Sequence, residues 1–333
     1  MAKPGHLSFE ALNAALRAAG EDTRLRILAL VAEAELTVTD LTEILGQSQP
    51  RISRHLKLMA EAGLLDRFRE GSWAFFRLAE QDALAAIARS LVTHLDPTDP
   101  VLLRDRHRLA QVRGARAAAA QAYFRRHAAE WDRIRRLHVA DEAVEAAMRE
   151  ALADRPIRSL LDLGTGTGRV LEVFGPQIER GLGIDMSLDM LLVARDRLER
   201  AGLRHCSVRQ GDIYELNVPE GSFDVVVIHQ VLHFLDDGAR AIRAAARALR
   251  PQGRLLVVDF APHDLEFLRE EHAHRRLGFA PETVSQWMSA AGLAVEGHRM
   301  LAPEPGSEGT IAVSLWLGRD PRLVLVSPER EVA

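Results

Sequence analysis

The apolar positions of the first third of the chain recur at helical spacing and predict three short helices. The three stripes are Leu25, Leu28 and Ala32; Leu41, Ile44 and Leu45; and Ile52, Leu56 and Met59. Asp22 and Ser48 are the expected N-caps of the first and third helices, the second helix is expected to begin after Thr37 and Thr39, and Gly46 and Gly63 are expected to end the second and third helices. The third helix carries basic side chains beside its apolar stripe.

A hairpin is predicted directly after these helices. Residues 64–69 and 73–78 have the composition of strands and flank a turn at residues 70–72, with arginines near its tip. Three helices followed by a basic hairpin predict an α+β winged helix-turn-helix.

The second half of the chain alternates short apolar runs with helical patterns. Runs that end near residues 162, 185, 210 and 228 predict strands of a parallel sheet with right-handed crossovers, which is a Rossmann-like α/β fold. Residues 280–291 predict a late helix, and residues 310–317 predict a strand of the antiparallel hairpin that ends such sheets.

The region between the two patterns predicts further helices. Leu84, Ile87, Leu91 and Leu95 form one stripe, which the proline-rich residues 96–100 interrupt. Residues 101–138 are rich in Ala and Arg and predict a connecting helix in solvent, or alternatively an arm along a DNA backbone. Its aromatic residues Tyr123 and Trp131 are either a lid over a ligand or packing at the domain junction.

Length and composition set limits on these elements. A chain of 333 residues with 47% hydrophobic content is long enough for two domains with separate cores. The formal charge of -4 gives no overall attraction to nucleic acid, so DNA binding must depend on a local surface. Cys206 is the only cysteine, which excludes a disulfide framework and a multi-thiolate metal site. With no export signal and no apolar run long enough to span a membrane, we expect a cytoplasmic protein without bound metal.

Three alternate glycines follow the run that ends at Asp162. A dinucleotide fingerprint, G-x-G-x-x-G, starting at Gly164 would need its third glycine at Arg169. The spacing that is present, D-x-G-x-G-x-G, therefore does not match that fingerprint. This spacing resembles the first motif of class I S-adenosylmethionine (SAM) dependent methyltransferases. Acids follow at Asp185 and Asp212, and residues 155–260 together resemble the ubiquinone/menaquinone-biosynthesis type. The alternative is ordinary Rossmann turns without a ligand.

The resemblance implies a seven-stranded, mostly parallel sheet that binds SAM or S-adenosylhomocysteine (SAH). Asp185 should accept hydrogen bonds from ribose hydroxyls, and Asp212 from the adenine amino group. The expected cofactor-binding residues are Asp162, Gly164, Thr165, Gly166, Gly168, Asp185, Met186, Asp212, Ile213, His229 and Gln230. No catalytic residue is assigned, because methyl transfer from a sulfonium requires positioning rather than an obligatory base.

Residues 47–57, followed by Ala62-Gly63-Leu64, resemble the recognition helix of the ArsR/SmtB family of bacterial repressors. The resemblance covers about residues 8–95 and implies a homodimer on a two-fold DNA site, with the third helix in the major groove. Carried over by position, the expected DNA-binding residues are Gln49, Arg51, Ser53, Arg54, His55, Lys57, Arg67, Arg69 and Arg77. The alternative is a winged helix used for protein contacts only.

One departure from that family concerns its metal trigger. Thr37 and Thr39 occupy the positions at which metal sensors of the family carry thiolates, and hydroxyls are poor ligands for soft metals. Another signal must therefore operate this domain if any does.

Two hypotheses of function follow. In the first, a DNA-binding transcriptional regulator senses SAM or SAH through its methyltransferase domain; in the second, an active methyltransferase modifies a small-molecule acceptor and carries an autoregulatory DNA-binding domain. A third, in which the helical half only promotes oligomerisation, is weaker. The chain lacks the acceptor motif of DNA amino-methyltransferases and the Pro-Cys of cytosine-C5 enzymes, and one cysteine cannot bind arsenite. The expected boundaries are 1–95 for the winged helix, 96–140 for a linker, 141–320 for the methyltransferase fold and 321–333 for a tail.

Overall fold

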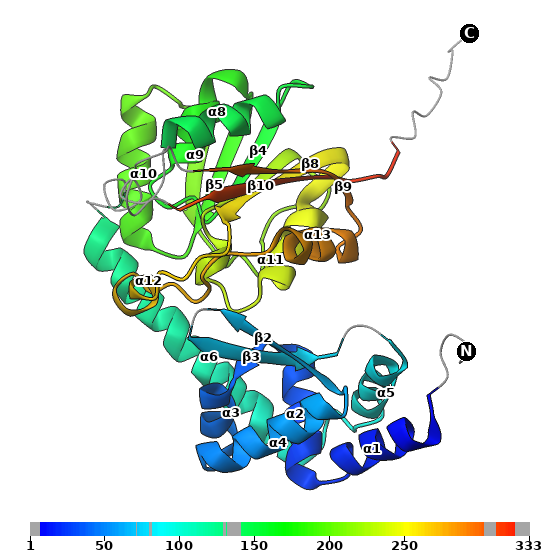
Figure 1. Cartoon of the computed structure of the whole chain (residues 1–333). Helices are drawn as coiled ribbons and strands as arrows, with labels where there is room; N and C mark the ends of the chain where they lie inside the picture. Colours follow the sequence, from blue (N-terminus) through cyan, green and yellow to red (C-terminus); the bar gives the residue numbers. More distant parts are fainter. Residues whose placement is uncertain are drawn as a thin grey trace. The chain divides into compact units, whose positions relative to one another are not determined.

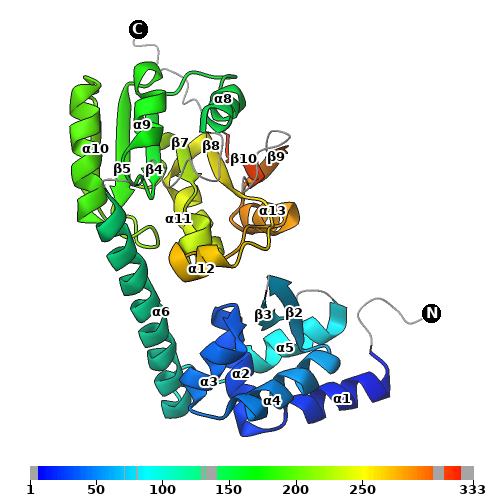
Figure 2. The same ribbon diagram turned by 60° about the vertical axis from the view of Figure 1, so that its left-hand side comes forward.

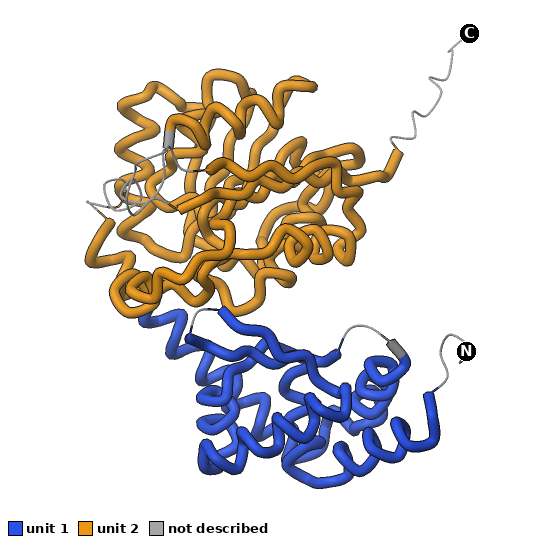
Figure 3. The backbone as a smooth tube through the Cα atoms, viewed as in Figure 1, with its two compact units in different colours: residues 1–119 blue, residues 120–333 orange. Residues whose placement is uncertain are grey.

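A computed structural model describes residues 7–70, 72–79, 82–128, 131, 141–302 and 311–323. The chain forms two compact units, Met1–Ala119 and Ala120–Ala333 (Figure 3). The division falls within helix α6 (Pro100–His127), so that one helix contributes to both units. The functional boundaries expected from the sequence stay a prediction.

The first unit combines helices with a small antiparallel sheet (Figure 1). Its sheet has the order β1-β3-β2, in which β3 pairs with both neighbours. Besides the first part of α6, its elements are α1 (Phe9–Ala19), α2 (Asp22–Glu33), β1 (Leu36–Thr37), α3 (Val38–Leu45), α4 (Gln49–Glu61), β2 (Leu65–Glu70), β3 (Trp73–Leu78) and α5 (Asp82–Thr93). The three helices and the hairpin expected from the sequence are confirmed as α2, α3, α4 and β2–β3.

Local capping explains where these helices begin and end. Thr37 and Asp40 form a reciprocal capping box at the start of α3, and Gly46 ends that helix in the left-handed conformation, with φ 64°. Ser48 occupies the N-cap position of α4 as expected. The expectation for α2 was wrong: its N-cap is Glu21, which accepts a hydrogen bond from the Arg24 N–H, and Asp22 is the first helical residue.

Helix α6 departs most from expectation, because its first half packs on the winged-helix core instead of standing in solvent. Leu102, Leu109 and Val112 are buried, and the latter two belong to the same apolar cluster as Ile27 and Leu41. The preceding helix α5 also differs: it ends before Leu95, and its most buried residues are alanines rather than the expected leucine stripe.

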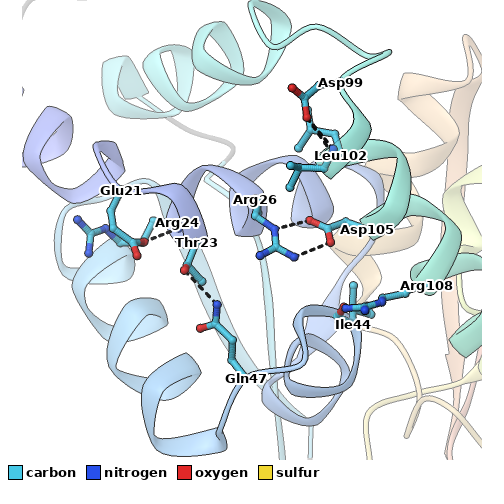
Figure 4. Close-up of polar contacts among 11 residues, drawn as sticks. Glu21, Thr23, Arg24, Arg26, Ile44, Gln47, Asp99, Leu102, Asp105 and Arg108 are labelled. Carbon is cyan, nitrogen blue, oxygen red and sulfur yellow. Dashed lines mark hydrogen bonds and ion pairs between the residues drawn. The ribbon is translucent and has the colours of Figure 1, made fainter.

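Ion pairs attach α6 to the helices beneath it. Arg26 of α2 donates two hydrogen bonds to the buried Asp105 of α6, each 2.6 Å long (Figure 4). Arg108 donates to the Ile44 carbonyl at the end of α3, and Arg116 pairs with the buried Asp40. Because both aspartates are removed from water, each needs its arginine to offset the cost of burying a charge.

The second unit is a three-layer α/β structure. Its seven-stranded sheet has the order β6-β5-β4-β7-β8-β10-β9. The first five strands in this order are parallel to one another, and β10 is antiparallel to both of its neighbours, β8 and β9. The strands are β4 (Ser159–Leu163), β5 (Arg180–Asp185), β6 (Cys206–Gln210), β7 (Phe223–His229), β8 (Leu249–Phe260), β9 (Ala294–Leu301) and β10 (Val313–Arg319). The expected mostly parallel sheet with a terminal antiparallel hairpin is confirmed.

Helices flank the sheet (Figure 2), and two apolar clusters cover its two faces. Helices α8 (Asp141–Ala151), α9 (Arg169–Phe174) and α10 (Leu188–Arg200) cover one face, and α11 (Gly238–Ala248) and α13 (Pro281–Ala290) cover the other. Short helices η2 (Gly175–Gln177), η3 (Leu232–Phe234) and α12 (Phe267–Glu271) lie in the connections. Burial on both faces explains why the central strands are almost uniformly apolar in sequence.

Two further findings bear on the expectations from composition. None of the helices in the described ranges has the length and hydropathy required to cross a membrane. Cys206 is a buried free thiol at the start of β6, and burial raises its pKa. This residue therefore acts as a small apolar side chain in the core.

The attachment of α6 can be tested at the Arg26–Asp105 pair. We expect Asp105→Asn to cost about 2–3 kcal/mol of local stability, because Arg26 then loses its charged partner. Native-state hydrogen exchange of the α2 and α3 amides measures this unit separately from the other. Glu61→Gln, which removes an exposed pair with Lys57, is the control and should change stability by less than about 0.5 kcal/mol. Equal effects of the two substitutions would contradict the assigned role.

Candidate functional site

The loop between β4 and α9 is held by hydrogen bonds to the neighbouring strand. The N–H groups of Gly164 and Thr165 donate to the Ile184 carbonyl, and the Gly166 N–H donates to Asp185 Oδ2 over 2.9 Å. The Thr165 hydroxyl donates to Asp162 Oδ2 over 2.6 Å. The buried Asp162 thus fixes the loop from one side, and Asp185 fixes it from the other.

The three glycines of this loop have positive φ, but their surroundings differ. A Cβ at Gly164 would lie 2.4 Å from Val231 Cγ2, and one at Gly168 would lie 3.1 Å from the Ala194 Cβ. Packing within the protein therefore excludes a side chain at Gly164 and leaves only a tight fit at Gly168. At Gly166 the nearest atom is the Trp131 Nε1, 3.8 Å away, so this is the open part of the loop.

Asp185 ends β5 with a carboxylate that is only partly buried. Its Oδ1 accepts the Ser187 N–H at 2.8 Å, in addition to the bond from Gly166 to Oδ2. Burial raises the pKa of this carboxyl, whereas the backbone N–H groups of Ser187, Gly166 and Met186 act in the opposite direction. Each oxygen keeps a lone pair and can accept one more hydrogen bond from a ligand hydroxyl.

The other expected cofactor-binding residues follow the ends of neighbouring strands. Met186 is exposed beside Asp185. Asp212 accepts the Tyr214 N–H and is followed by the buried Ile213. His229 ends β7, and Gln230 directly after it has a φ of 54°. All of these positions therefore belong to the carboxyl edge of the parallel strands, where α/β folds bind ligands.

An aromatic cluster lies beside the open part of the loop. The Trp131 ring is 5.2 Å from the Phe124 ring and 6.2 Å from the Phe234 ring, between centroids. Tyr123 is buried and its hydroxyl forms a 2.7 Å hydrogen bond with His272 Nδ1. The position of Trp131 next to Gly166 fits the lid alternative from the sequence; residues 129–130 and 132–140 lie outside the described part.

Sequence reasoning did not single out a buried pair next to this cluster. His233 of η3 hydrogen-bonds through Nδ1 to Asp259 Oδ1 of β8 at 2.7 Å. The sequence assigned no role to either residue. No sequence spacing signals this pair, because its members belong to different elements and meet only in the folded sheet.

Most of the expected DNA-binding side chains are exposed on the first unit. Gln49, Arg51, Ser53, Arg54 and Lys57 are exposed along α4. Arg67 and Arg69 are exposed on β2 of the hairpin. These seven residues are available to a large partner.

Two members of that set are placed differently. His55 is only 9% exposed, and its Nδ1 lies 3.9 Å from Glu21 Oε2. Burial lowers the pKa of His55, so the structure favours a neutral packing residue over the expected base contact. Arg77 is half-buried between Glu35 and Asp66, at 3.5 Å and 3.8 Å. Its charge is already shared with these carboxylates.

Metal binding finds no support in the described ranges, where no three His, Cys, Asp or Glu side chains are grouped so that they could hold an ion. Thr37, at one of the positions where a thiolate was considered, instead caps α3 through its hydroxyl.

Family comparisons agree with both units. Residues 21–67 match the model described as bacterial regulatory protein, arsR family, and residues 161–257 match the model described as methyltransferase domain. The chain joins an ArsR-family helix-turn-helix to a methyltransferase domain. The first match includes the exposed α4 surface, and the second extends from the glycine loop to β8.

Individual relatives match the methyltransferase domain. The uncharacterized methyltransferase YcgJ of Bacillus subtilis is 33% identical over 106 residues, which are 32% of this chain and 42% of that protein. The ubiquinone/menaquinone biosynthesis C-methyltransferase UbiE of Vibrio cholerae is 37% identical over 116 residues, 34% of this chain and 45% of that protein. The chain thus spans less than half the length of these relatives. The crystal structure of YcgJ aligns with a TM-score of 0.46 and 20% identity, covering 55% of this chain and all of the other.

The packing explanation for Gly164 can be tested by substitution. Gly164→Ala should cost about 3 kcal/mol or more, because left-handed strain adds to the clash with Val231. Gly202→Ala is the matched control: Gly202 also has a φ of 70°, but nothing lies within 4 Å of its Cβ position, so we expect a cost of about 1 kcal/mol. Thermal unfolding measures both. Adding Val231→Ala should recover part of the loss in the Gly164 variant and nothing in the Gly202 variant.

The acid sensitivity of the domain can be tested at His263. Burial lowers the pKa of His263 to about 4 from an ordinary 6.5. As the pH drops below 6.5, His263 therefore becomes protonated in the unfolded chain before it does so in the folded protein. The free energy of unfolding then falls between pH 6.5 and about pH 4, by roughly 2 kcal/mol after discounting for partial exposure. His263→Asn should remove this part of the pH dependence in urea unfolding, since Asn can still accept the Leu265 N–H. The exposed His298→Asn should keep the slope of the wild type, and loss of that slope would contradict the assignment.

Proposed function

We propose that the chain is a DNA-binding transcriptional regulator whose methyltransferase domain binds SAM or SAH, and that occupancy of this domain changes its affinity for DNA. The observation that carries the proposal is helix α6. Its first half is bonded into the winged-helix core through Asp105 and Arg116. Its last turns carry Tyr123 and Phe124, which contact the Trp131 ring beside the glycine loop. A ligand bound at the glycine loop would therefore act, through Trp131, on a helix that is also part of the DNA-binding unit.

The glycine loop and its surroundings fit an adenosyl ligand. Gly166 leaves the main chain open under Trp131, and Asp185 retains acceptor capacity for ribose hydroxyls. Met186 and Ile213 supply apolar contact for adenine, and Asp212 accepts from its amino group. Asp162, Gly164, Thr165 and Gly168 shape the loop, while His229 and Gln230 line the methionine end. When bound, SAM supplies a sulfonium-activated methyl group.

We assign DNA binding to the exposed side chains of α4 and β2. In this proposal Gln49, Arg51 and Ser53 read bases, and Arg54, Lys57, Arg67 and Arg69 contact phosphates. Residues 47–77 contain six basic and three acidic side chains, so this surface is locally positive although the chain is not. We propose that the regulator acts in the cytoplasm as a homodimer. The exposed apolar side chains of Phe9, Leu12 and Leu16 on α1 support a dimer, because a second copy would cover them.

The test combines ligand binding with DNA binding by the full-length protein. SAM and SAH are titrated by calorimetry, and a duplex selected from a random pool is titrated by fluorescence anisotropy. We expect one ligand to change the DNA dissociation constant by at least about 5-fold. Asp185→Ala should abolish this response, whereas Asp196→Ala, an exposed aspartate of α10, should not. Arg54→Ala should weaken DNA binding and leave ligand binding intact, and Arg200→Ala should change neither kind of binding.

The outcomes separate the parts of the proposal. If neither ligand binds at millimolar concentration, the donor site is wrong. If a ligand binds but the DNA dissociation constant is unchanged, sensing is wrong and the donor site stands. The second candidate function, an active methyltransferase on a small-molecule acceptor with an autoregulatory DNA-binding domain, is favoured by the His233–Asp259 pair.

A further inference from the structure

The His233–Asp259 pair is built as an oriented histidine. The side chains are 2% and 0% exposed, and Asp259 Oδ1 accepts both His233 Nδ1 and the Phe260 N–H. An ionised Asp259 requires the hydrogen on Nδ1 of the neutral imidazole. The lone pair is then on Nε2, which is the arrangement that a proton acceptor needs.

Two aromatic rings, those of Phe234 and Trp131, lie between this pair and the glycine loop. The Phe234 ring is 4.0 Å from the His233 ring and 6.2 Å from the Trp131 ring, between centroids. Trp131 in turn is the nearest residue to the open position at Gly166. Because η3 follows β7 and Asp259 lies near the end of β8, the pair belongs to the same carboxyl edge as the glycine loop.

Two independent features indicate that a polar ligand completes this region. Asp259 Oδ2 and Gln230 Nε2 are buried, and within the described residues neither has a hydrogen-bond partner. Buried polar atoms are nearly always paired, so such atoms call for an explanation. The backbone is also strained here: Gln230 and Ala273 have φ values of 54° and 57° without being glycine. Strain of this kind concentrates at functional sites.

We propose that His233 is the general base of a methyl-acceptor site at the ends of β7 and β8, and that the acceptor is a phenol. The proposal rests on the donor binding proposed above. His233 Nε2 takes the proton of the phenolic hydroxyl. The oxygen forms a bond to the methyl carbon of the donor sulfonium, and the electron pair of the broken carbon–sulfur bond stays on sulfur as a neutral thioether. The imidazolium then returns its proton to water. Asp259 is a positioning residue.

The surroundings select this class of acceptor. The rings of Phe234, His274 and Phe260 lie 4.0 Å, 4.3 Å and 4.7 Å from the His233 ring, between centroids, which suits a flat aromatic acceptor. A phenolic hydroxyl has a pKa of about 10, close enough to that of an imidazole for assisted proton transfer. An aliphatic alcohol is a much weaker acid, so the same base would assist its methylation less effectively.

The first experiment detects proton transfer without turnover. Full-length protein saturated with SAH is mixed with 4-nitrophenol, whose phenolate absorbs visible light, at a pH where the free probe is mostly protonated. We expect wild type to raise the phenolate fraction at least about 3-fold, and His233→Gln and Asp259→Asn to abolish the increase. His298→Gln, an exposed histidine of the same domain, is the control and should behave as wild type.

The second experiment measures transfer of labelled methyl from SAM to the same probe. His233→Gln should lower kcat by about 100-fold or more while the SAH dissociation constant changes less than about 3-fold. SAH calorimetry and thermal unfolding verify that each variant is folded, and Asp259→Asn provides a second variant. If wild type binds SAH but neither ionises nor methylates the probe, or if His233→Gln equals wild type, the inference is overturned. If wild type does not bind SAH, the donor site fails first and this inference falls with it.

Discussion

The hydrogen bond from the Gly166 N–H to the Asp185 carboxylate is the contact on which the site of this protein depends. It ties the turn after one parallel strand to the last residue of the next, and the backbone bonds to the Ile184 carbonyl extend the same connection. The turn must therefore run close to β5, which explains the tight packing of Gly164 and Gly168. One carboxylate thus shapes the loop and remains able to accept hydrogen bonds from a ligand.

Helix α6 carries buried ion pairs along its first half and aromatic side chains at its end. An alanine- and arginine-rich helix has little apolar surface, so it cannot be attached by burial of leucines alone. The arginines of α2 and α6 instead pair with carboxylates of α6 and α3, and these carboxylates are buried. Removing either partner leaves a charge uncompensated, so α6 is held at the one position along α2 and α3 at which both pairs form. The same helix ends in aromatic residues that belong to the other unit.

The carboxyl edge of the sheet carries two separate sets of polar groups. One set, at β4, β5 and β6, consists of carboxylates and open backbone that suit a nucleoside. The other, at β7 and β8, consists of an oriented histidine, a buried aspartate and aromatic rings. Trp131 and Phe234 lie between them. A sensor needs only the first set, whereas an enzyme needs both, so the second set is the part of the structure that distinguishes the two functions.

The sequence by itself determined the features that depend on neighbours along the chain. Helical and strand periodicity, the helix start near Thr37 and Thr39, the Gly46 terminus and the spacing of glycines and acids all lie within a few residues or within one βαβ unit. Local geometry fixes such features, and for that reason the two domains, the sheet and the positions of the expected site residues could be predicted.

Only the tertiary structure decided the contacts between distant segments. Arg26 and Asp105 are 79 residues apart, and His233 and Asp259 are 26 apart. The sequence pattern of α6 predicted a solvated helix because its arginines resemble surface residues until their buried partners are known. His55 likewise shares a helix face with exposed arginines but is covered, beside Glu21. Burial and pairing depend on how elements pack, and periodicity along one element carries no information about its partner.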